Sequence, residues 1–280
     1  MGGQTDLRAL TRYDASIDFR FMVHPSAIVD PRAKIDPTVT VGPYAIIESG
    51  ATLEKGSTVA SHCIVHRGAH VGENVYLGSF SVIGGLPQDL SFEASIASGV
   101  RIGKNTVIRE HVTIHRATSQ GKNTIVGEAC YLMNASHVAH DCVLGRGVCL
   151  TNNVLLGGHV HVGDFANLGG GASVHQGVRV GAYTMVGAFS IATIDVPPFT
   201  LCADRNRLRG LNLVGLKRRG FGSAVVSDLK RCFRDFYMNE GSFSERLEAL
   251  EPKTEEGAAF VAFIRAGKPG KIMRPQTKWR

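Results

Sequence analysis

The sequence contains no run that resembles a membrane span or a secretion signal. Hydrophobic residues make up 44% of its 280 residues, but no stretch approaches the ~20 consecutive apolar residues that cross a bilayer. Residues 1–20 contain several charged side chains and no apolar core, which excludes a signal peptide. We interpret residues 1–20 as a poorly ordered N-terminal extension. We therefore expect a cytoplasmic protein without stable membrane insertion.

Several other common features are missing. The six cysteines show no paired spacing, which favours buried thiols in a reducing compartment over disulfides. No nucleophile elbow, Walker loop or dinucleotide fingerprint is present, so covalent catalysis and nucleotide hydrolysis are disfavoured. Aromatic residues make up only 7% of the chain and are not interleaved with the basic residues. Because no nucleic-acid-reading motif appears either, we expect no nucleic-acid partner.

What the chain does contain is a six-residue repeat. An aliphatic residue recurs at every sixth position from Val23 to Ile83, again from Ile102 to Ile114, and then from Val126 to Val186. Hexapeptide periodicity is typical of a parallel β-helix, in which each hexad forms one flat side of a triangular coil. Small residues at the fifth position fit a narrow core, and Gly or Asn at the fourth tolerates the positive φ of a corner. The repeat predicts a mainly β fold.

Two segments interrupt the repeat. Residues 86–99 predict a loop ejected from the coil, and the stretch 116–124 predicts a shorter bulge. Interruptions of a solenoid usually map to its working face, because an exposed loop has little reason to persist unless it covers something.

The repeat ends before a segment of different character. Pro197 and Pro198 cannot extend a sheet ladder, so we place the β-helix at residues 21–198 and a helical domain at 199–280. Helical periodicity predicts three helices: one capped by Ser223, one over 244–250 and one over 254–265. Residues 267–275, rich in Gly and Pro, predict a frayed tail.

Charge is divided unevenly between these parts. Residues 199–280 contain 17 Lys and Arg against 9 Asp and Glu, a net charge of +8, whereas residues 1–198 carry −1. A basic appendage suggests an acidic partner such as a phosphorylated ligand or an acidic protein. A solvated helix face explains such a charge excess equally well.

Histidine placement gives the strongest chemical signal. Three hexads per coil bring the chain back to the same side after 18 residues, so His140, His159 and His175 should line one edge, with His137 and Asp141 beside them. A neutral imidazole suits a general base near pH 7, and a neighbouring carboxylate orients it. The alternative is that such residues merely occupy corners. His62 and His111 also sit at fourth positions, where a histidine is more often a corner residue than a catalyst. We assign His24, His66, His70, His115 and His161 to structure or surface.

Four short motifs of the chain resemble those of a known family. Residues 136–142 read Ser-His-Val-Ala-His-Asp-Cys, 157–159 Gly-Gly-His, 174–176 Val-His-Gln, and 215–221 Gly-Leu-Lys-Arg-Arg-Gly-Phe. This ordered combination closely resembles the UDP-N-acetylglucosamine acyltransferases that begin lipid A synthesis. The similarity extends from about Phe21 to the C-terminal helices.

The resemblance implies a left-handed β-helix that assembles into a homotrimer with active sites between neighbours. It implies transfer of a (3-hydroxy)acyl chain from acyl carrier protein to the sugar 3-position of UDP-N-acetylglucosamine, with phosphopantetheine on the carrier protein and no other cofactor or metal. His140 matches the general base, Asp141 its orienting partner, and Gly158 the oxyanion donor. The residues that match substrate contacts are Asp89, His137, His159, His175, Gln176, Asn212, Arg218 and Arg219.

Three positions depart from the family pattern. Ser91 stands where the family often has Lys, and Val214 where it often has Glu, so a 3-amino analogue of UDP-N-acetylglucosamine, acylated on nitrogen, is an alternative acceptor. Ala188 matches a position that limits acyl length, and alanine there predicts a shorter or differently seated chain.

Three other readings stay open. A γ-class carbonic anhydrase has the same architecture with zinc-binding histidines. A non-catalytic scaffold would show regular outward side chains, which this repeat lacks. The third alternative function is that of an N-acyl- or acetyltransferase acting on another nucleotide sugar.

Overall fold

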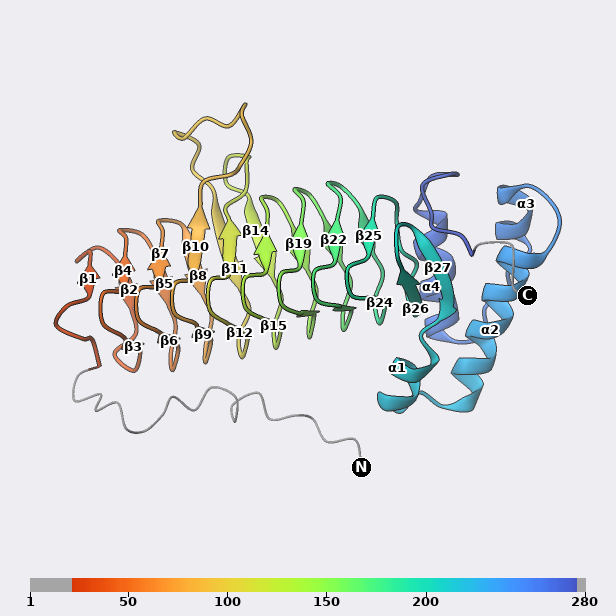
Figure 1. Ribbon diagram of the computed structural model, residues 1–280, viewed down its shortest axis with the longest axis horizontal. Helices are drawn as coiled ribbons and strands as arrows, with labels where there is room; N and C mark the ends of the chain where they lie inside the picture. The colour runs from red at the N-terminus through yellow and green to blue at the C-terminus, as the bar shows by residue number, and fades with distance from the viewer. Residues whose placement is uncertain (1–21, 276–280) are drawn as a thin grey trace.

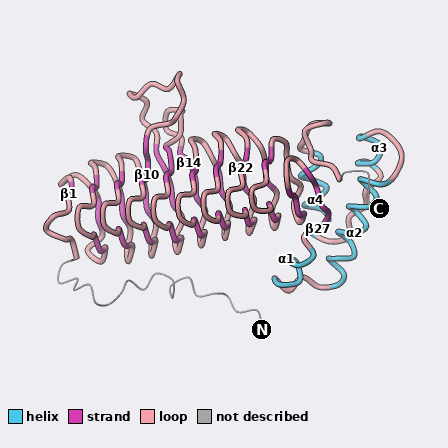
Figure 2. The backbone as a smooth tube through the Cα atoms, in the orientation of Figure 1, coloured by secondary structure: helices cyan, strands magenta, loops and turns pink. Residues whose placement is uncertain are grey.

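The computed structural model describes residues 22–275, and the extension predicted at residues 1–20 lies outside this range. The chain winds into a long three-sided coil, with a group of helices at its C-terminal end (Figure 1). Short strands recur along each side and loops join them at the corners (Figure 2). The parallel β-helix with a small helical region that the repeat predicts is therefore confirmed.

Each side of the coil is a parallel sheet, apart from the last strand of the third sheet, which is antiparallel. The first sheet contains β1 (Ile28–Val29), β4 (Ile46–Ile47), β7 (Ile64–Val65), β10 (Val82–Gly85), β13 (Thr113–His115), β16 (His137–Val138), β19 (Leu155–Leu156), β22 (Ser173–Val174) and β25 (Ile191–Ala192). The second contains β2 (Lys34–Ile35), β5 (Thr52–Leu53), β8 (Ala69–Val71), β11 (Gly99–Ile102), β14 (Asn123–Val126), β17 (Val143–Leu144), β20 (His161–Val162) and β23 (Arg179–Val180). The third contains β3 (Thr40–Val41), β6 (Thr58–Val59), β9 (Tyr76–Leu77), β12 (Val107–Ile108), β15 (Tyr131–Leu132), β18 (Cys149–Leu150), β21 (Asn167–Leu168), β24 (Met185–Val186), β26 (Thr200–Ala203) and β27 (Arg207–Leu211).

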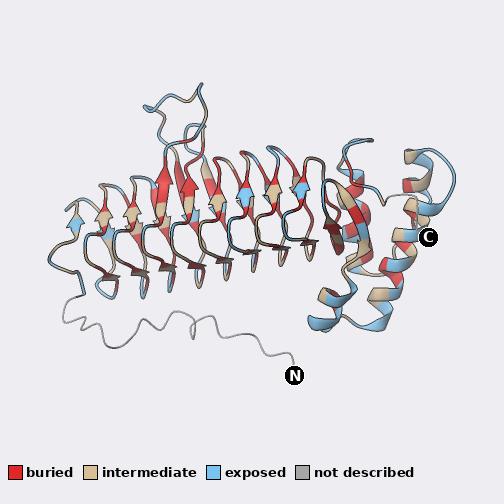
Figure 3. Ribbon diagram, in the orientation of Figure 1, coloured by how far each residue is buried: buried red, intermediate tan, exposed pale blue. Residues whose placement is uncertain are grey.

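The aliphatic residue of each hexad fills the core. In the regular coils paired strands lie 18 residues apart, so that Val138 pairs with Leu156 and Leu156 with Val174. These side chains are at most 3% exposed, while the preceding residue of each strand points outward. In Figure 3, residues coloured as buried recur along the strands of the coil. Burying one such side chain contributes roughly 1.5–3 kcal/mol, so the repeat itself stabilises the coil.

Three edges separate the sheets, and residues with positive φ mark their corners. Edge X joins the first sheet to the second and has Gly50, Gly68, Asp141, His159 and Gly177 at its corners. Edge Y joins the second sheet to the third and has Gly56, Asn74, Asn105, Ala129, Gly147, Phe165 and Tyr183. Edge Z joins the third sheet to the first and has Tyr44, His62, Phe80, His111, Ala135, Asn153, Gly171 and Phe189.

Both interruptions of the repeat lie on edge X. The first leaves the coil between β10 and β11 and projects from it (Figure 1), while the second lies between β13 and β14. The ejected loop ends one residue earlier than predicted, because Gly99 already belongs to β11.

The ladder continues past the paired prolines. Strand β26 pairs in parallel with β24, and β27 then turns back antiparallel. The Pro197 carbonyl accepts hydrogen bonds from the hydroxyls of Thr184 and Thr200. The two prolines therefore lie between Val196, which still pairs with Val180, and β26. The coil extends beyond the boundary that the sequence predicts at residue 198.

Four helices follow: α1 (Leu213–Arg218), α2 (Ser223–Met238), α3 (Phe243–Glu248) and α4 (Glu255–Arg265). Helix α1 has no counterpart among the predicted helices. Ser223 is the first residue of α2 rather than its cap, which is Gly222. Helix α3 begins before the predicted position because Ser242 and Glu245 form a capping box.

The prediction of a frayed tail at residues 267–275 is wrong. Ile272 pairs with Asp195, the Met273 N–H donates to the Asp195 carbonyl, and both apolar side chains are buried. The Tyr237 hydroxyl also donates to the Met273 carbonyl. Residues 267–275 therefore pack onto the last coil. The two adjacent apolar residues, Ile272 and Met273, were the sequence feature that indicated this packing. Among the described residues, no helix combines the length and apolar character that a bilayer crossing requires.

Candidate active site

His140 and Asp141 lie side by side where β16 turns into edge X. His140 is buried, and its Nδ1 is 2.9 Å from Oδ2 of Asp141. Because a carboxylate only accepts, Nδ1 carries a proton. In the neutral imidazole, Nε2 then has the lone pair that a general base requires.

A threonine from the second interruption positions the carboxylate. Thr118 donates from its hydroxyl to Oδ2 of Asp141 at 2.8 Å and from its backbone N–H at 3.2 Å. Burial opposes ionisation of Asp141, but the hydrogen bonds from His140 and Thr118 outweigh it and keep the pKa of Asp141 below its usual value. Asp141 is therefore a carboxylate at neutral pH.

Gly158 lies one coil above His140. A Cβ at Gly158 would be 2.6 Å from Nε2 of His140, so only glycine fits against the imidazole. Among the described residues, the backbone N–H of Gly158 has no acceptor. A free N–H beside the basic nitrogen can stabilise an oxyanion that forms there.

His159 completes the group. It is exposed, and its Nε2 is 3.7 Å from Oδ2 of Asp141. Its ring meets that of His140 edge to face, with centroids 5.1 Å apart. Ligand atoms of His140, Asp141 and His159 all lie within 4.8 Å of one another, close enough to hold one metal ion. Two imidazoles and a carboxylate are a donor set that suits zinc.

A second imidazole pair lies behind this group on the first sheet. His137 Nδ1 is 2.7 Å from the Thr113 hydroxyl, and its ring meets that of His115 edge to face at 4.8 Å. Nδ1 of the buried His115 has no partner among the described residues. Burial, together with charge on His137 and His140, lowers the pKa of His115 to about 4.

His175 and Gln176 continue edge X toward the C-terminal end. Both are exposed, and Gly177, the next residue, donates its N–H to the Gly158 carbonyl. The two residues line a cavity of about 560 Å³, whose basic members are Arg179, Arg205, Lys268 and Lys271. The structure therefore has His140, His159 and His175 on one edge, as the repeat predicts.

The ejected loop brings Asp89 to the same edge. The Ser91 hydroxyl and N–H both donate to Oδ1 of Asp89, at 2.7 and 2.9 Å. These bonds lower the pKa of Asp89, and positive charge on His140 and His159 acts in the same direction. Ser91 thus favours the ionised form of Asp89.

Arg116 anchors the loop. It is 2% exposed, donates to the carbonyls of Ile96 and Ala94 at 2.9 and 3.1 Å, and lies 5.1 Å from the Phe92 ring centroid. Neither Arg116 nor Thr118 was assigned a role from the sequence. The only signal was their place in the second interruption.

The remaining predicted contacts lie at edge Y. Asn212 caps α1 by accepting from the Gly215 N–H at 3.0 Å, and it donates to the Tyr183 carbonyl. The guanidinium of Arg219 stacks 4.4 Å from the Phe165 centroid, and Arg218 is exposed beside it. Together they line a cavity of about 560 Å³ that contains none of the histidines. Within one chain, the structure does not bring Asn212, Arg218 and Arg219 to edge X.

Ala188 lies on neither of these edges. It is exposed on edge Z, beside Phe189, which is 82% exposed. The predicted site residues of one chain are thus distributed over all three edges of the prism.

Comparison with known proteins gives a consistent result. A family profile described as UDP N-acetylglucosamine O-acyltransferase, domain 2, matches residues 195–272. An acyl-[acyl-carrier-protein]–UDP-N-acetylglucosamine O-acyltransferase of Caulobacter vibrioides is 42% identical over 91% of this chain and 98% of its own.

Solved structures agree. The UDP-N-acetylglucosamine acyltransferase of Francisella novicida superposes with a TM-score of 0.87 at 31% identity, covering 91% of this chain and 95% of its own. That of Campylobacter jejuni superposes with a TM-score of 0.84 at 32% identity, covering 91% and 99%. The coil has the expected left hand. The chain therefore belongs to the UDP-N-acetylglucosamine O-acyltransferase family.

Proposed function

We propose that the protein transfers a (3-hydroxy)acyl chain from acyl carrier protein to the 3-hydroxyl of UDP-N-acetylglucosamine, the first step of lipid A synthesis. The observation that carries this proposal is the His140–Asp141 pair, with its basic Nε2 beside the free N–H of Gly158. Family membership favours oxygen over nitrogen as the acceptor atom, and it disfavours both the carbonic anhydrase and the scaffold.

The reaction follows from these groups. Nε2 of His140 takes the proton of the 3-hydroxyl as the sugar oxygen attacks the thioester carbonyl carbon. Asp141 stabilises the imidazolium, and the Gly158 N–H donates to the oxyanion. The intermediate expels the phosphopantetheine thiolate, which takes the proton back from Nε2. Such a base contributes about 10²–10⁴-fold and an oxyanion donor about 10²–10³-fold.

The substrates occupy the surrounding residues. The sugar nucleotide contacts His137, His159, His175, Gln176 and Asp89 on edge X, and its uridine diphosphate contacts Asn212, Arg218 and Arg219. The donor is acyl carrier protein, whose phosphopantetheine makes a separate cofactor unnecessary, and no metal takes part. The net charge of +8 over residues 199–280 suits both acidic partners. The limit on the length of the acyl chain is assigned to Ala188 from the family pattern alone, since Ala188 lies on edge Z, outside edges X and Y.

The active form is a homotrimer. Within one chain His140 and Arg219 lie on edges that are separated by the second sheet, a hexad spanning up to about 20 Å at 3.3 Å per residue. One sugar nucleotide reaches both groups when edge X of one copy meets edge Y of the next. Three copies related by a threefold axis then form three equivalent sites.

We also place the reaction in the cytoplasm. All six cysteines are free, and burial raises the pKa of the Cys142 thiol to about 12. Unpaired, unreactive thiols fit a reducing compartment.

The test is direct assay of the purified protein. Acyl carrier protein thioesters of several chain lengths are incubated with UDP-N-acetylglucosamine or its 3-amino analogue, and the products are weighed by mass spectrometry. We expect O-acylation of UDP-N-acetylglucosamine, and a His140→Ala variant that is folded but at least ~10²-fold slower. Near-normal turnover in that variant would refute His140 as the base. Preference for the amino sugar would overturn the acceptor.

A further inference from the structure

Arg116 carries a buried charge without a neighbouring counter-charge. At 2% exposure it is the only buried lysine or arginine among residues 22–275. Within the same range its guanidinium donates only to the carbonyls of Ala94 and Ile96, and its Nε has no partner. Burial lowers the pKa of Arg116, and the charge of Arg67 acts in the same direction.

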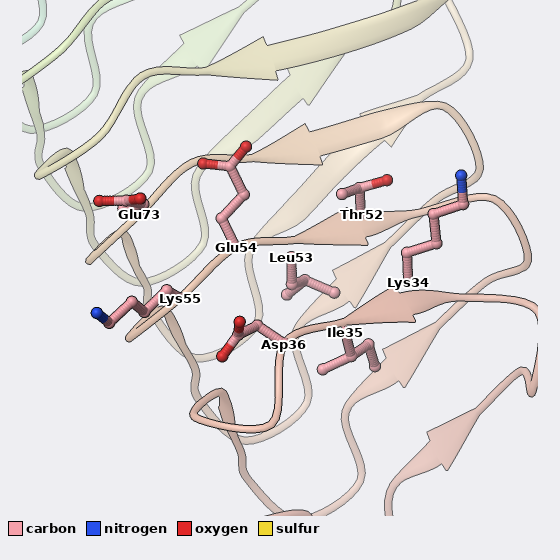
Figure 4. A pocket seen from close by; sticks show the side chains of 8 residues that line it. All are labelled: Lys34, Ile35, Asp36, Thr52, Leu53, Glu54, Lys55 and Glu73. Carbon is pink, nitrogen blue, oxygen red and sulfur yellow. The ribbon is translucent and has the colours of Figure 1, made fainter.

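Other charged side chains of the coil are placed differently. A hollow on the second sheet is lined by charges of both signs, none of them buried: Lys34, Lys55, Asp36, Glu54 and Glu73 (Figure 4). Burying a cation without a neighbouring anion costs stability. Stabilisation of the coil therefore does not explain why an arginine stands at position 116.

The guanidinium of Arg116 contacts the ejected loop. It donates to the Ala94 carbonyl at 3.1 Å and to the Ile96 carbonyl at 2.9 Å, and it lies 5.1 Å from the centroid of the Phe92 ring. A cation over an aromatic face is attracted by the quadrupole of the ring. All three partners belong to the loop, whereas the backbone N–H of Arg116 donates to the Gly85 carbonyl at the end of β10.

The arm of the loop that carries Asp89, residues 86–93, has few other attachments. Among the hydrogen bonds of the described residues, none joins this arm to the coil. Asp89 accepts from Ser91 within the arm, and its carbonyl accepts from the Phe92 N–H at 3.0 Å. Phe92 is the residue whose ring lies against Arg116. A cation–ring contact followed by one hydrogen bond therefore links the coil to Asp89.

The base of the loop is held separately. The Ala97 carbonyl accepts from the Gly121 N–H at 2.8 Å, and the Ala97 N–H donates to the Gln120 side chain at 2.9 Å. Neither bond uses the guanidinium. The two donors from Thr118 to Asp141 do not use it either. Loss of the guanidinium should therefore release the arm and leave the catalytic pair in place.

We propose that Arg116 is a positioning residue for the sugar nucleotide, which keeps Asp89 at edge X through the ring of Phe92. The inference rests on the proposed function, in which Asp89 contacts the sugar. Because the guanidinium is buried beneath the loop, it acts through Asp89 and not by touching the substrate. Its loss should weaken binding of the sugar nucleotide and leave the chemical step nearly unchanged.

A double-mutant cycle tests this role. Affinity for UDP-N-acetylglucosamine is measured by isothermal titration calorimetry for wild type, Arg116→Met, Asp89→Ala and the double variant. Arg116→Met should weaken binding about tenfold, as expected when a hydrogen bond to a charged group is misplaced, and raise KM equally with kcat within about threefold. The double variant should bind no more weakly than Asp89→Ala, because residues that act through one contact are not additive. Additive losses, or wild-type affinity of Arg116→Met, would overturn the proposal.

Arg101→Met is the matched control. Arg101 is exposed on β11, the strand that follows the ejected loop. The substitution removes the same charge without touching the loop, so binding should equal that of wild type. An equal loss in Arg101→Met would make the lost charge alone responsible and would refute the positioning role.

Arg116→Lys covers the case in which Arg116→Met does not fold. A lysine keeps the charge but lacks the flat fork that spans two carbonyls and stacks on a ring. Arg116→Lys should therefore also weaken binding, and only while Asp89 is present. Wild-type affinity of Arg116→Lys would contradict the proposal.

The same titrations separate this role from the proposed function. A wild type that binds the sugar nucleotide no more tightly than Arg116→Met removes only the role of Arg116. A wild type that binds neither UDP-N-acetylglucosamine nor its 3-amino analogue counts against the proposed function itself.

Discussion

The imidazole of His140 occupies the space that a side chain at position 158 would need. Cβ at Gly158 would lie 2.6 Å from Nε2 and 3.1 Å from Nδ1. The base and the proposed oxyanion donor are thus adjacent because one of them has no side chain.

Gly158→Ala should therefore disable the base without unfolding the coil. The added methyl group displaces the ring from Asp141, and misplacement of about 1 Å can cost ~10²-fold in rate. We expect kcat to fall by about that factor while the circular dichroism spectrum is unchanged. Gly170→Ala is the control, because its methyl group meets nothing closer than 3.6 Å within the chain. Equal activity of the two variants would contradict the close packing.

Thr118→Val should lower kcat and leave KM for the sugar nucleotide unchanged. It removes the hydroxyl donor to Oδ2 of Asp141 and keeps the backbone donor. A hydrogen bond to a charged group is worth about 1.5–3 kcal/mol, so we expect a loss of roughly tenfold or more. Thr52→Val, on the outward row of the second sheet, serves as control. A change in KM alone would argue for substrate contact instead of positioning.

His115 should make the protein less stable in mild acid. Its pKa is about 4 in the folded chain against an ordinary 6.5, chiefly because of burial. The unfolded chain therefore takes up the proton first as the pH falls. The stabilisation is complete above pH 6.5 and is lost progressively toward pH 4.

Melting temperatures of wild type and His115→Gln between pH 7.5 and 4.5 check this expectation. The wild type should lose more over this range than the variant does. His161→Gln, on the exposed row of the second sheet, should follow the wild type. Parallel curves for wild type and His115→Gln would remove His115 as the cause.

Arg219→Lys should weaken binding of the sugar nucleotide more than it slows turnover. The guanidinium is held over Phe165 at 4.4 Å and over Tyr183 at 5.6 Å. A lysine cannot reproduce this stacking or the paired hydrogen bonds to phosphate. We expect KM to rise about tenfold with kcat within about threefold. Arg234→Lys, exposed on α2, should change neither constant.

Removal of metal should leave acyl transfer intact. His140, Asp141 and His159 are close enough to hold an ion, yet the proposed reaction needs the lone pair of Nε2 of His140, and an ion bound to that nitrogen would remove it. Dialysis against a chelator, followed by assay and elemental analysis, distinguishes acyl transfer that needs no metal from acyl transfer that depends on a bound ion. Loss of activity that zinc restores would require a different mechanism.

The regular coils were predictable and the interrupted ones were not. A constant spacing of 18 residues fixes which side chains stack, so the alignment of Asp141 with His159 follows from counting. At the interruptions the paired residues lie 31 and 24 apart, as Val82 with Thr113 and Thr113 with His137 show. The spacing of residues therefore could not predict the contact between Thr118 and Asp141, because that contact depends on how the inserted segment folds.

The structure of the C-terminal part depends on contacts that leave no periodic pattern in the sequence. Asn212 matched a substrate contact, but its side chain also caps α1 and holds it to Tyr183. The Gly and Pro content of residues 267–275 indicated a frayed tail. The two apolar neighbours in this segment, Ile272 and Met273, which are buried in the structure, were not taken into account.

The pairing of Ile272 with Asp195 also bears on self-assembly. A parallel β-helix ends in a ladder of unsatisfied backbone groups, onto which another coil could add. Here β27 covers β26, and the 267–275 segment covers the chain at Asp195. The chain itself therefore pairs with strand groups at this end onto which another coil could otherwise add.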